Sequence, residues 1–374
     1  QLLGWRYNFR LGLGNDRCVP WSLIHFSRKR IYRNHCGHLE RHLRHIRLRI
    51  SKRSPASLIG AQSCNQKSED ETISFILIRM LKTILISLVA FCIATGLHAQ
   101  MDSVFFDGAY RHYALHFPPQ YDGSTPLPLV ICLHGGFGSG LQFEEQSTLS
   151  EKSDEAGFVA VYPNGTGYLL APNLRFWNAG NCCGYAEEQN IDDVGFIEAM
   201  IDALVADYAI DATRVYSTGI SNGAFMSYRL ACELSDKIAA IAPVAGGMLV
   251  DECLPSSSVP IIHFQSFLDT SNPYTGGVGD GVGTHDNPPL DSVFTVWANT
   301  NLCTNLADTI SVSEEYTHVR WNNCECNRRI DYYITEDGGH SWPGGTSPAF
   351  GDPVSEVIDA NDFMWDFFLE FTTD

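Results

Sequence analysis

The sequence predicts an α/β fold in which a mostly parallel sheet carries helices on both faces. From residue 100 onward, short apolar runs alternate with amphipathic segments. Two of the runs, residues 127–133 (LPLVICL) and 158–162 (FVAVY), are apolar throughout, as is typical of strands buried on both faces. Because neighbouring parallel strands need a crossover, this alternation of strands and helices indicates a parallel sheet between two helical layers.

Each remaining element follows from its own periodicity. Residues 111–117 (RHYALHF) alternate between polar and apolar side chains, which predicts a half-buried strand. Val194, Ile197 and Ile201 recur at helical spacing within residues 192–208, and the two aspartates that begin this helix are favoured there without any metal. Further strands are expected at 214–218, 238–244, 259–264 and 330–334, and further helices at 224–234 and 356–371.

Charge and apolar patterning divide the chain into three parts. Residues 1–79 hold 15 Lys/Arg and five Asp/Glu, whereas residues 100–374 hold nine and 38. The strong negative charge of residues 100–374 repels phosphate groups. We therefore do not expect nucleic acid as a partner. The first methionine, Met80, opens a segment with a lysine, an apolar centre and a small-residue end, which is the pattern of a secretory signal peptide.

We therefore expect residues 80–99 to be a signal peptide that is removed near Ala99. Residues 1–79 are then upstream translation rather than part of the native protein, a basic nucleic-acid arm being the alternative. Residues 100–374 are expected to form one exported domain, secreted or periplasmic, with no membrane span left after cleavage.

Export favours disulfides among the cysteines of the exported domain. Cys132 lies in an apolar run and is expected to be a buried free thiol. The pairings that we favour are Cys232 with Cys253, and Cys303 with either Cys324 or Cys326. A zinc site at Cys324 and Cys326 is the alternative. The Cys-x-Cys spacing is one residue shorter than the usual Cys-x-x-Cys, so we expect no metal there. We expect no cofactor either. Connectivity stays open among seven cysteines: Cys182, Cys183, Cys232, Cys253, Cys303, Cys324 and Cys326.

The strongest chemical signal is Gly-Ile-Ser-Asn-Gly at residues 219–223. It follows the expected strand at 214–218 and opens the expected helix at 224–234. A serine flanked by glycines at such a strand–turn–helix junction is a nucleophile elbow, because the turn is too tight for side chains. Ser221 is therefore the candidate nucleophile.

A serine nucleophile needs a base, and the base needs an orienting acid, in the chain order Ser, acid, His. His340 lies in a loop directly after the strand at 330–334, which is where a catalytic histidine should lie. Asp269 follows the strand at 259–264, and active-site groups gather at that edge of a parallel sheet. The alternative acids are Asp251 and Asp291. Three other histidines also follow the serine but are less well placed: His263, His285 and His318.

The oxyanion of an acyl-transfer intermediate needs backbone N–H donors already in place. We expect one from Asn222, which follows the nucleophile, and others from Gly136 and Phe137 in the loop after the strand at 127–133. His134 is expected to shape that loop by hydrogen bonding. Two tryptophans near the site, Trp177 and Trp342, could stack on a sugar or phenolic ring.

In order and spacing, these segments resemble a known family, through LPLVICLHGG, FVAVYPNG, FWNAGNCCG with IDDVGF, RVYSTGISNGAFMSYRLAC, IAAIAPVAG and GGHSWPGG. The family is the secreted polyhydroxybutyrate depolymerase, feruloyl and acetylxylan esterase group (carbohydrate esterase family one, esterase subtype). The resemblance covers nearly all of residues 105–370. It implies a single α/β-hydrolase domain with Ser221, Asp269 and His340 as nucleophile, acid and base. Relatives usually have H-G-T-x-D before the acid, whereas this chain has QSFLD at residues 265–269.

The resemblance implies a secreted serine esterase without a cofactor. Its substrate would be a small or polymeric ester: an acetyl or feruloyl ester of plant-wall polysaccharide, or a short hydroxyalkanoate oligomer. The alternatives are a polyhydroxybutyrate or other polyester depolymerase, a serine peptidase on the same fold, and a non-catalytic hydrolase-fold binding protein. The sequence fixes neither the natural ester nor the oligomeric state.

Overall fold

The computed structural model describes residues 100–373 apart from 282, 284, 305–306 and 348–350. The expected signal peptide (80–99) and the expected upstream segment (1–79) lie outside the described residues. Within the described part, no helix has the length and apolarity that crossing a bilayer requires.

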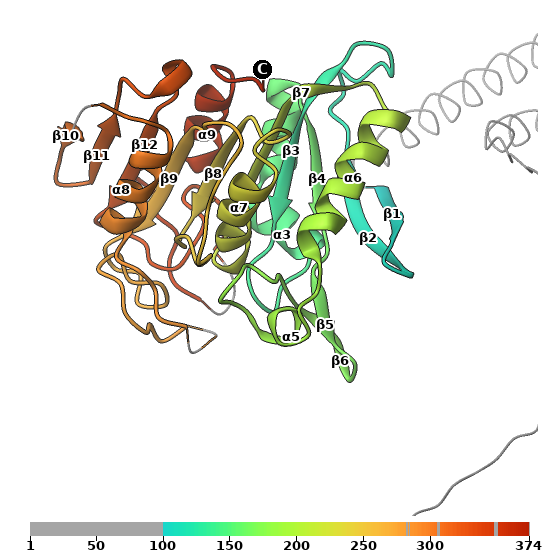
Figure 1. Ribbon diagram of the computed structural model, residues 1–374, viewed down its shortest axis with the longest axis horizontal. Coiled ribbons are helices and arrows are strands. Elements are labelled where there is room, and N and C mark those ends of the chain that lie inside the picture. Colours follow the sequence, from blue (N-terminus) through green and yellow to red (C-terminus); the bar gives the residue numbers. More distant parts are fainter. Residues whose placement is uncertain (1–99, 282, 284, 305–306, 348–350, 374) are drawn as a thin grey trace, which may run out of the picture. The chain divides into compact units, whose positions relative to one another are not determined.

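Ten strands form one sheet with the order β1-β2-β4-β3-β7-β8-β9-β12-β11-β10 (Figure 1). The six central strands, from β4 to β12 in that order, are parallel, and the strands at both edges are antiparallel. This is the mostly parallel sheet that the sequence predicts. The strands are β1 (Gln100–Phe106), β2 (Ala109–His116), β3 (Leu127–Leu133), β4 (Val159–Pro163), β7 (Ile210–Ile220), β8 (Ala240–Val244), β9 (Ile261–Ser266), β10 (Asp308–Val312), β11 (Tyr316–Trp321) and β12 (Ile330–Thr335).

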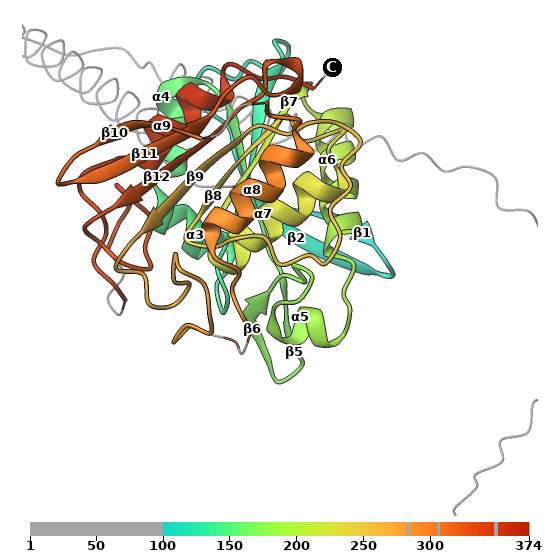
Figure 2. The same cartoon turned by 60° about the vertical axis from the view of Figure 1, so that its left-hand side comes forward.

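Helices cover both faces of this sheet. Buried side chains of α6, α7 and α8 form one hydrophobic layer, and those of α3, α4 and α9 form the other (Figures 1 and 2). A separate hairpin, β5 (Thr166–Tyr168) with β6 (Ala171–Phe176), projects beside α5 (Figure 1). The helices are α3 (Gly140–Ser147), α4 (Leu149–Ala156), α5 (Gly184–Glu188), α6 (Asp193–Asp207), α7 (Asn222–Glu233), α8 (Leu290–Thr300) and α9 (Ala360–Phe368).

The apolar strand β3 contributes side chains to both hydrophobic layers. Leu129, Ile131 and Leu133 point into the layer under α6 and α7, while Val130 and Cys132 point into the opposite layer. Successive side chains of a strand face opposite sides, so a strand covered on both faces must be apolar at every position. Cys132 is a buried free thiol, as expected.

Some helices and strands begin at other residues than the sequence predicts. Helix α9 begins at Ala360 and not at residue 356, because the Asp359 side chain accepts hydrogen bonds from the first backbone amides of the helix. Strand β8 likewise begins at Ala240 and not at residue 238. The edge strands β1 and β10 and the helices α3, α4 and α8 were not expected.

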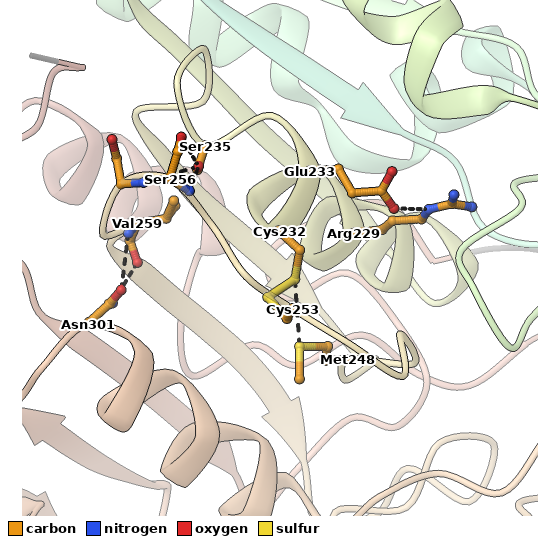
Figure 3. Close-up of a disulfide and its surroundings, with 10 residues drawn as sticks. Arg229, Cys232, Glu233, Ser235, Met248, Cys253, Ser256, Val259 and Asn301 are labelled. Carbon is orange, nitrogen blue, oxygen red and sulfur yellow. Dashed lines mark hydrogen bonds and ion pairs between the residues drawn. A yellow bond between two sulfur atoms is a disulfide. The ribbon is translucent and has the colours of Figure 1, made fainter.

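Two disulfides confirm the local pairings. Cys232 pairs with Cys253 and joins the end of α7 to the segment after β8, with Met248 beside it (Figure 3). Cys303 pairs with Cys324, which is therefore not available to a zinc ion. A third bond joins the neighbours Cys182 and Cys183, and Cys326 is a free, exposed thiol.

Candidate active site

Ser221 lies between the end of β7 and the start of α7, near the carboxyl end of the parallel strands. Its backbone has φ 57° and ψ −120°, a strained conformation for a residue with a side chain. A Cβ at either Gly219 or Gly223 would overlap the carbonyl oxygen of Leu133 in the neighbouring strand. The two glycines are therefore required for the elbow to pack against β3, as the sequence pattern predicts.

Asp269 and His340 meet although 71 positions separate them in the chain. The Nδ1 atom of His340 lies 2.9 Å from Oδ2 of Asp269, a buried side chain. The other carboxylate oxygen accepts the backbone N–H groups of Ser271 and Asn272 at 2.9 and 2.8 Å. The backbone N–H of His340 is itself fixed by Asp352 at 2.7 Å. Because Nδ1 donates to the carboxylate, Nε2 is left as the basic nitrogen of the ring.

Neither alternative acid contacts the histidine. Asp251 accepts a hydrogen bond from Asn181, and Asp291 accepts one from the hydroxyl of Tyr274. The structure thus brings Asp269, and not these two, to His340.

The loop after β3 lies directly beside Ser221. A Cβ built on Gly135 would be 3.5 Å from the Cβ of Ser221. The backbone hydrogen bond of this loop runs from the Gly138 amide to the Gly135 carbonyl at 3.1 Å, which leaves the amides of Gly136 and Phe137 unpaired among the described residues. The amide of Asn222, at the first position of α7, has no acceptor within its helix. Three amides in the neighbourhood are therefore free to bind an oxyanion.

The side chain of Asn222 has a role that the sequence reasoning missed. Its Oδ1 accepts the backbone N–H of Trp177 at 2.7 Å, and its Nδ2 donates to the Trp177 carbonyl at 3.0 Å. This paired contact ties the residue after the nucleophile to the segment between β6 and α5. Asparagine satisfies both backbone groups at once because its amide carries one acceptor and one donor side by side.

His134 shapes the loop, as expected. Its Nδ1 contacts the Gly135 carbonyl at 2.7 Å, and its Nε2 accepts the Gly165 amide at 3.0 Å. Burial lowers the pKa of His134 to about 4, so the ring stays neutral and can accept that amide.

The expected substrate contacts of Trp177 and Trp342 are wrong. Both side chains are 0% exposed and offer no face to a ligand. Trp177 donates its indole N–H to the His134 carbonyl, and Trp342 donates to the side chain of Asn361. A buried indole needs an acceptor for its N–H, and these two hydrogen bonds attach each tryptophan to the segment that supplies the acceptor.

A cavity of about 280 Å³ opens over the nucleophile, and both Ser221 and His340 line it. Its aromatic lining comes from Phe143, Phe176 and Phe225, which are 1–3% exposed and which the sequence reasoning did not select. His285, considered only as an alternative base, also lines the cavity, and its Nε2 has no hydrogen-bond partner among the described residues. Phe176 directly precedes Trp177, but the sequence analysis selected only the tryptophan.

Two buried histidines should make the folded protein sensitive to acid. Burial lowers the pKa of His134 to about 4 and that of His263 to about 3, from the ordinary value of 6.5. Below pH 6.5 the unfolded chain therefore binds more protons than the folded one. The free energy of unfolding then decreases as the pH is lowered. We expect the melting temperature to decline between pH 6.5 and about 4.5, above the range where most carboxylates titrate. The same decline should persist in His112→Ala, which removes an exposed imidazole. A constant melting temperature across the interval would contradict this reading.

Comparison with known proteins finds one matching family model and several similar esterases. Residues 111–270 match the family model described as Esterase PHB depolymerase. Feruloyl esterase B of Piromyces equi is 30% identical over 247 residues, which cover 62% of this chain and 42% of that protein. Probable feruloyl esterase C of Aspergillus terreus is 26% identical over 259 residues, covering 69% of this chain and 83% of that protein. The solved acetyl xylan esterase from Aspergillus awamori is 14% identical, with a TM-score of 0.49, over 72% of this chain and 99% of that one.

This chain thus spans less than half the length of the Piromyces protein. The matched residues 111–270 run from β2 to the turn that follows β9, and they include the elbow, the loop after β3 and Asp269. Residues 111–270 thus match the Esterase PHB depolymerase family model, in agreement with the resemblance that the motifs carry.

Proposed function

We propose that this chain is an exported serine esterase that hydrolyses carboxylic esters through an acyl-enzyme on Ser221. One observation carries the proposal: the strained elbow holds Ser221 in the same cavity as His340, whose ring is oriented by the buried carboxylate of Asp269. A serine, a histidine and a buried acid in this arrangement have the roles of nucleophile, base and orienting group on several unrelated folds.

In the proposed reaction, Nε2 of His340 takes the proton of Ser221 as the serine oxygen attacks the ester carbonyl. The amides of Asn222, Gly136 and Phe137 stabilise the oxyanion that forms. The intermediate collapses, the C–O bond to the alcohol breaks, and the imidazolium returns its proton to the leaving oxygen. Water then attacks the acyl-enzyme with the same base, which releases the acid and restores the serine.

The cavity supports a compact acyl or phenolic group as substrate. A volume of about 280 Å³ is at the lower end of small-molecule sites, so it favours an acetyl or feruloyl group over a long alkyl chain. Phe176 and Phe225 provide aromatic surface, while Gln142 and His285 provide hydrogen-bonding groups. We propose acetyl or feruloyl esters of plant-wall polysaccharide, or short hydroxyalkanoate oligomers, as the substrates.

A panel of esters tests this function: methyl ferulate, acetylated xylan, hydroxybutyrate oligomers and p-nitrophenyl esters of rising acyl length. We expect activity on acetyl and feruloyl esters, and a steep fall beyond about eight acyl carbons, because each methylene that does not fit is worth ~1 kcal/mol. Ser221→Ala is the control for background hydrolysis. A preference for long acyl chains would contradict the proposed substrate class, and a lack of activity on every ester would favour the non-catalytic binding protein.

A further inference from the structure

Gln265 stands where the resembling family usually has histidine, and its side chain touches the proposed acid. Its Nε2 donates to Oδ2 of Asp269 at 2.9 Å and to the backbone carbonyl of Asn272, also at 2.9 Å. That Oδ2 atom is the one that receives Nδ1 of His340. The Asp269 carboxylate therefore divides one oxygen between a catalytic imidazole and a buried amide, which is only 3% exposed.

The other end of the Gln265 amide faces a second buried histidine. Gln265 and His263 are two positions apart on β9, so their side chains share one face of the sheet. Gln265 Oε1 and His263 Nε2 are both buried, and neither makes a hydrogen bond to a described residue. The two atoms are complementary, because the amide oxygen can only accept and the imidazole nitrogen can carry a proton. Gln265 also raises the pKa of His263, against the lowering by burial. On its other nitrogen, His263 contacts the hydroxyl of Tyr228 at 3.1 Å.

Chemistry assigns the direction of each of these hydrogen bonds. Asp269 and the carbonyl of Asn272 can only accept, so Gln265 must present its NH2 to them and its oxygen to His263. His263 then carries its proton on Nε2 and accepts at Nδ1 from the Tyr228 O–H. Burial keeps this assignment stable, because it lowers the pKa of His263 to about 3 and raises that of Tyr228 well above its usual value.

We propose that Tyr228, His263 and Gln265 form a buried hydrogen-bond chain that positions the Asp269 carboxylate against the imidazole of His340. In this assignment Tyr228 donates to His263, His263 to Gln265, and Gln265 to the Asp269 carboxylate. Tyr228 lies on α7, the helix that begins beside the nucleophile, so the chain links the nucleophile helix to the acid through β9. Gln265 is thus a positioning residue. The proposal rests on the proposed function.

Among the titratable groups around His340, Asp269 is the one that contacts the imidazole ring. Asp352 binds the backbone N–H of His340 and not its ring. Across the cavity, burial lowers the pKa of His134 to about 4 and also lowers that of His285, so burial disfavours a positive charge on either ring. A change in hydrogen bonding at Asp269 should therefore reach His340 directly.

Gln265→Met tests the chain, because it keeps the length of the side chain and removes the donor. With one donor fewer, the carboxylate holds more negative charge toward His340, and the imidazolium is stabilised. We expect kcat to fall about tenfold, as for a lost hydrogen bond to a charged group, with KM nearly unchanged. The acidic limb of the pH–rate profile should move to higher pH by about half a unit.

Tyr228→Phe should move the same limb in the same direction by a smaller amount, since it acts through His263 and Gln265. The matched control is Tyr216→Phe, which also removes one buried hydroxyl, in this case bound to the carbonyl of Phe371 at 2.8 Å. That control should leave the pH profile unchanged. If Gln265→Met does not fold, Tyr228→Phe decides the question, because phenylalanine keeps the ring.

A second readout does not depend on catalysis. The proton between His340 and Asp269 should give a downfield NMR resonance, and we expect it to shift in Gln265→Met and Tyr228→Phe but not in Tyr216→Phe. A folded Gln265→Met protein with the wild-type pH limb and the wild-type resonance would overturn the chain. Wild-type protein that hydrolyses no ester would instead overturn the proposed function, and the resonance would still decide on the chain.

Discussion

Ser221→Ala is expected to lower kcat/KM for p-nitrophenyl acetate by about three to six orders of magnitude. In the proposed mechanism the serine oxygen forms the covalent intermediate, so its loss would remove the acyl-enzyme route and leave only the free amides and substrate binding. The melting temperature should not change, because the Ser221 hydroxyl makes no hydrogen bond to any described residue and only one atom is lost. His340→Ala should reduce the rate by a similar factor, since it removes the proposed base.

The matched control is Ser217→Ala, on strand β7, which leads to Ser221. Its hydroxyl is buried and contacts that of Ser227 at 2.9 Å, away from the cavity. This variant should hydrolyse p-nitrophenyl acetate within a few-fold of the wild-type rate. A folded Ser221→Ala protein with a near wild-type rate would move the nucleophile to another residue.

Asp193→Ala should cause a large loss of stability. The Asp193 carboxylate is fully buried, contacts the Arg111 guanidinium at 2.7 Å and accepts the Asn178 amide at 2.8 Å. Removing it leaves Arg111, whose side chain is only 13% exposed, without this partner. Breaking a buried pair from one side costs about 3–5 kcal/mol, which is a large part of a typical free energy of unfolding.

The adjacent aspartate is the natural control. Asp192 is exposed and caps α6 by accepting the Gly195 amide at 2.8 Å. Asp192→Ala should cost about 1 kcal/mol, as for other lost helix caps. Chemical denaturation of the two variants, followed by circular dichroism, measures the difference. Equal losses for both variants would show that the Arg111 contact adds nothing to stability.

These two aspartates show where sequence reasoning reaches its limit. The position at a helix start explained both residues equally well, and it is sufficient for Asp192. Only the packing of α6 against β2 reveals that Asp193 is an ion-pair partner of Arg111, 82 positions earlier in the chain. Local patterns contain the cap but not the long-range contact.

The geometry of the candidate site was predictable because its residues follow local and topological rules. The elbow has a short motif between a strand and a helix, and parallel strands bring Asp269 and His340 to one edge of the sheet. Trp177 and Phe176 lack such a rule. Both are aromatic neighbours, and which of them faces the cavity depends on how the segment is held by Asn222 and His134.

The edge strands were missed for a related reason. The side chains of β10 are mostly exposed, so neither a continuous apolar run nor a clear alternation marks this strand in the sequence. Strand β1 has no fully buried residue: three of its seven residues are exposed and four are partly buried. Helix α8 follows a stretch rich in glycine and proline, whose composition hides the start of an amphipathic segment at Leu290.

The contact of Gly219 and Gly223 with the Leu133 carbonyl has a consequence for directed evolution. Libraries that vary these two glycines should yield almost no folded, active clones, because any side chain there pushes the nucleophile strand away from its neighbour. Gln142, Gln146 and His285 line the cavity on elements that do not form the elbow. Diversity is therefore best concentrated at these three wall positions, where substrate range can be changed without disturbing the backbone that places the reacting oxygen.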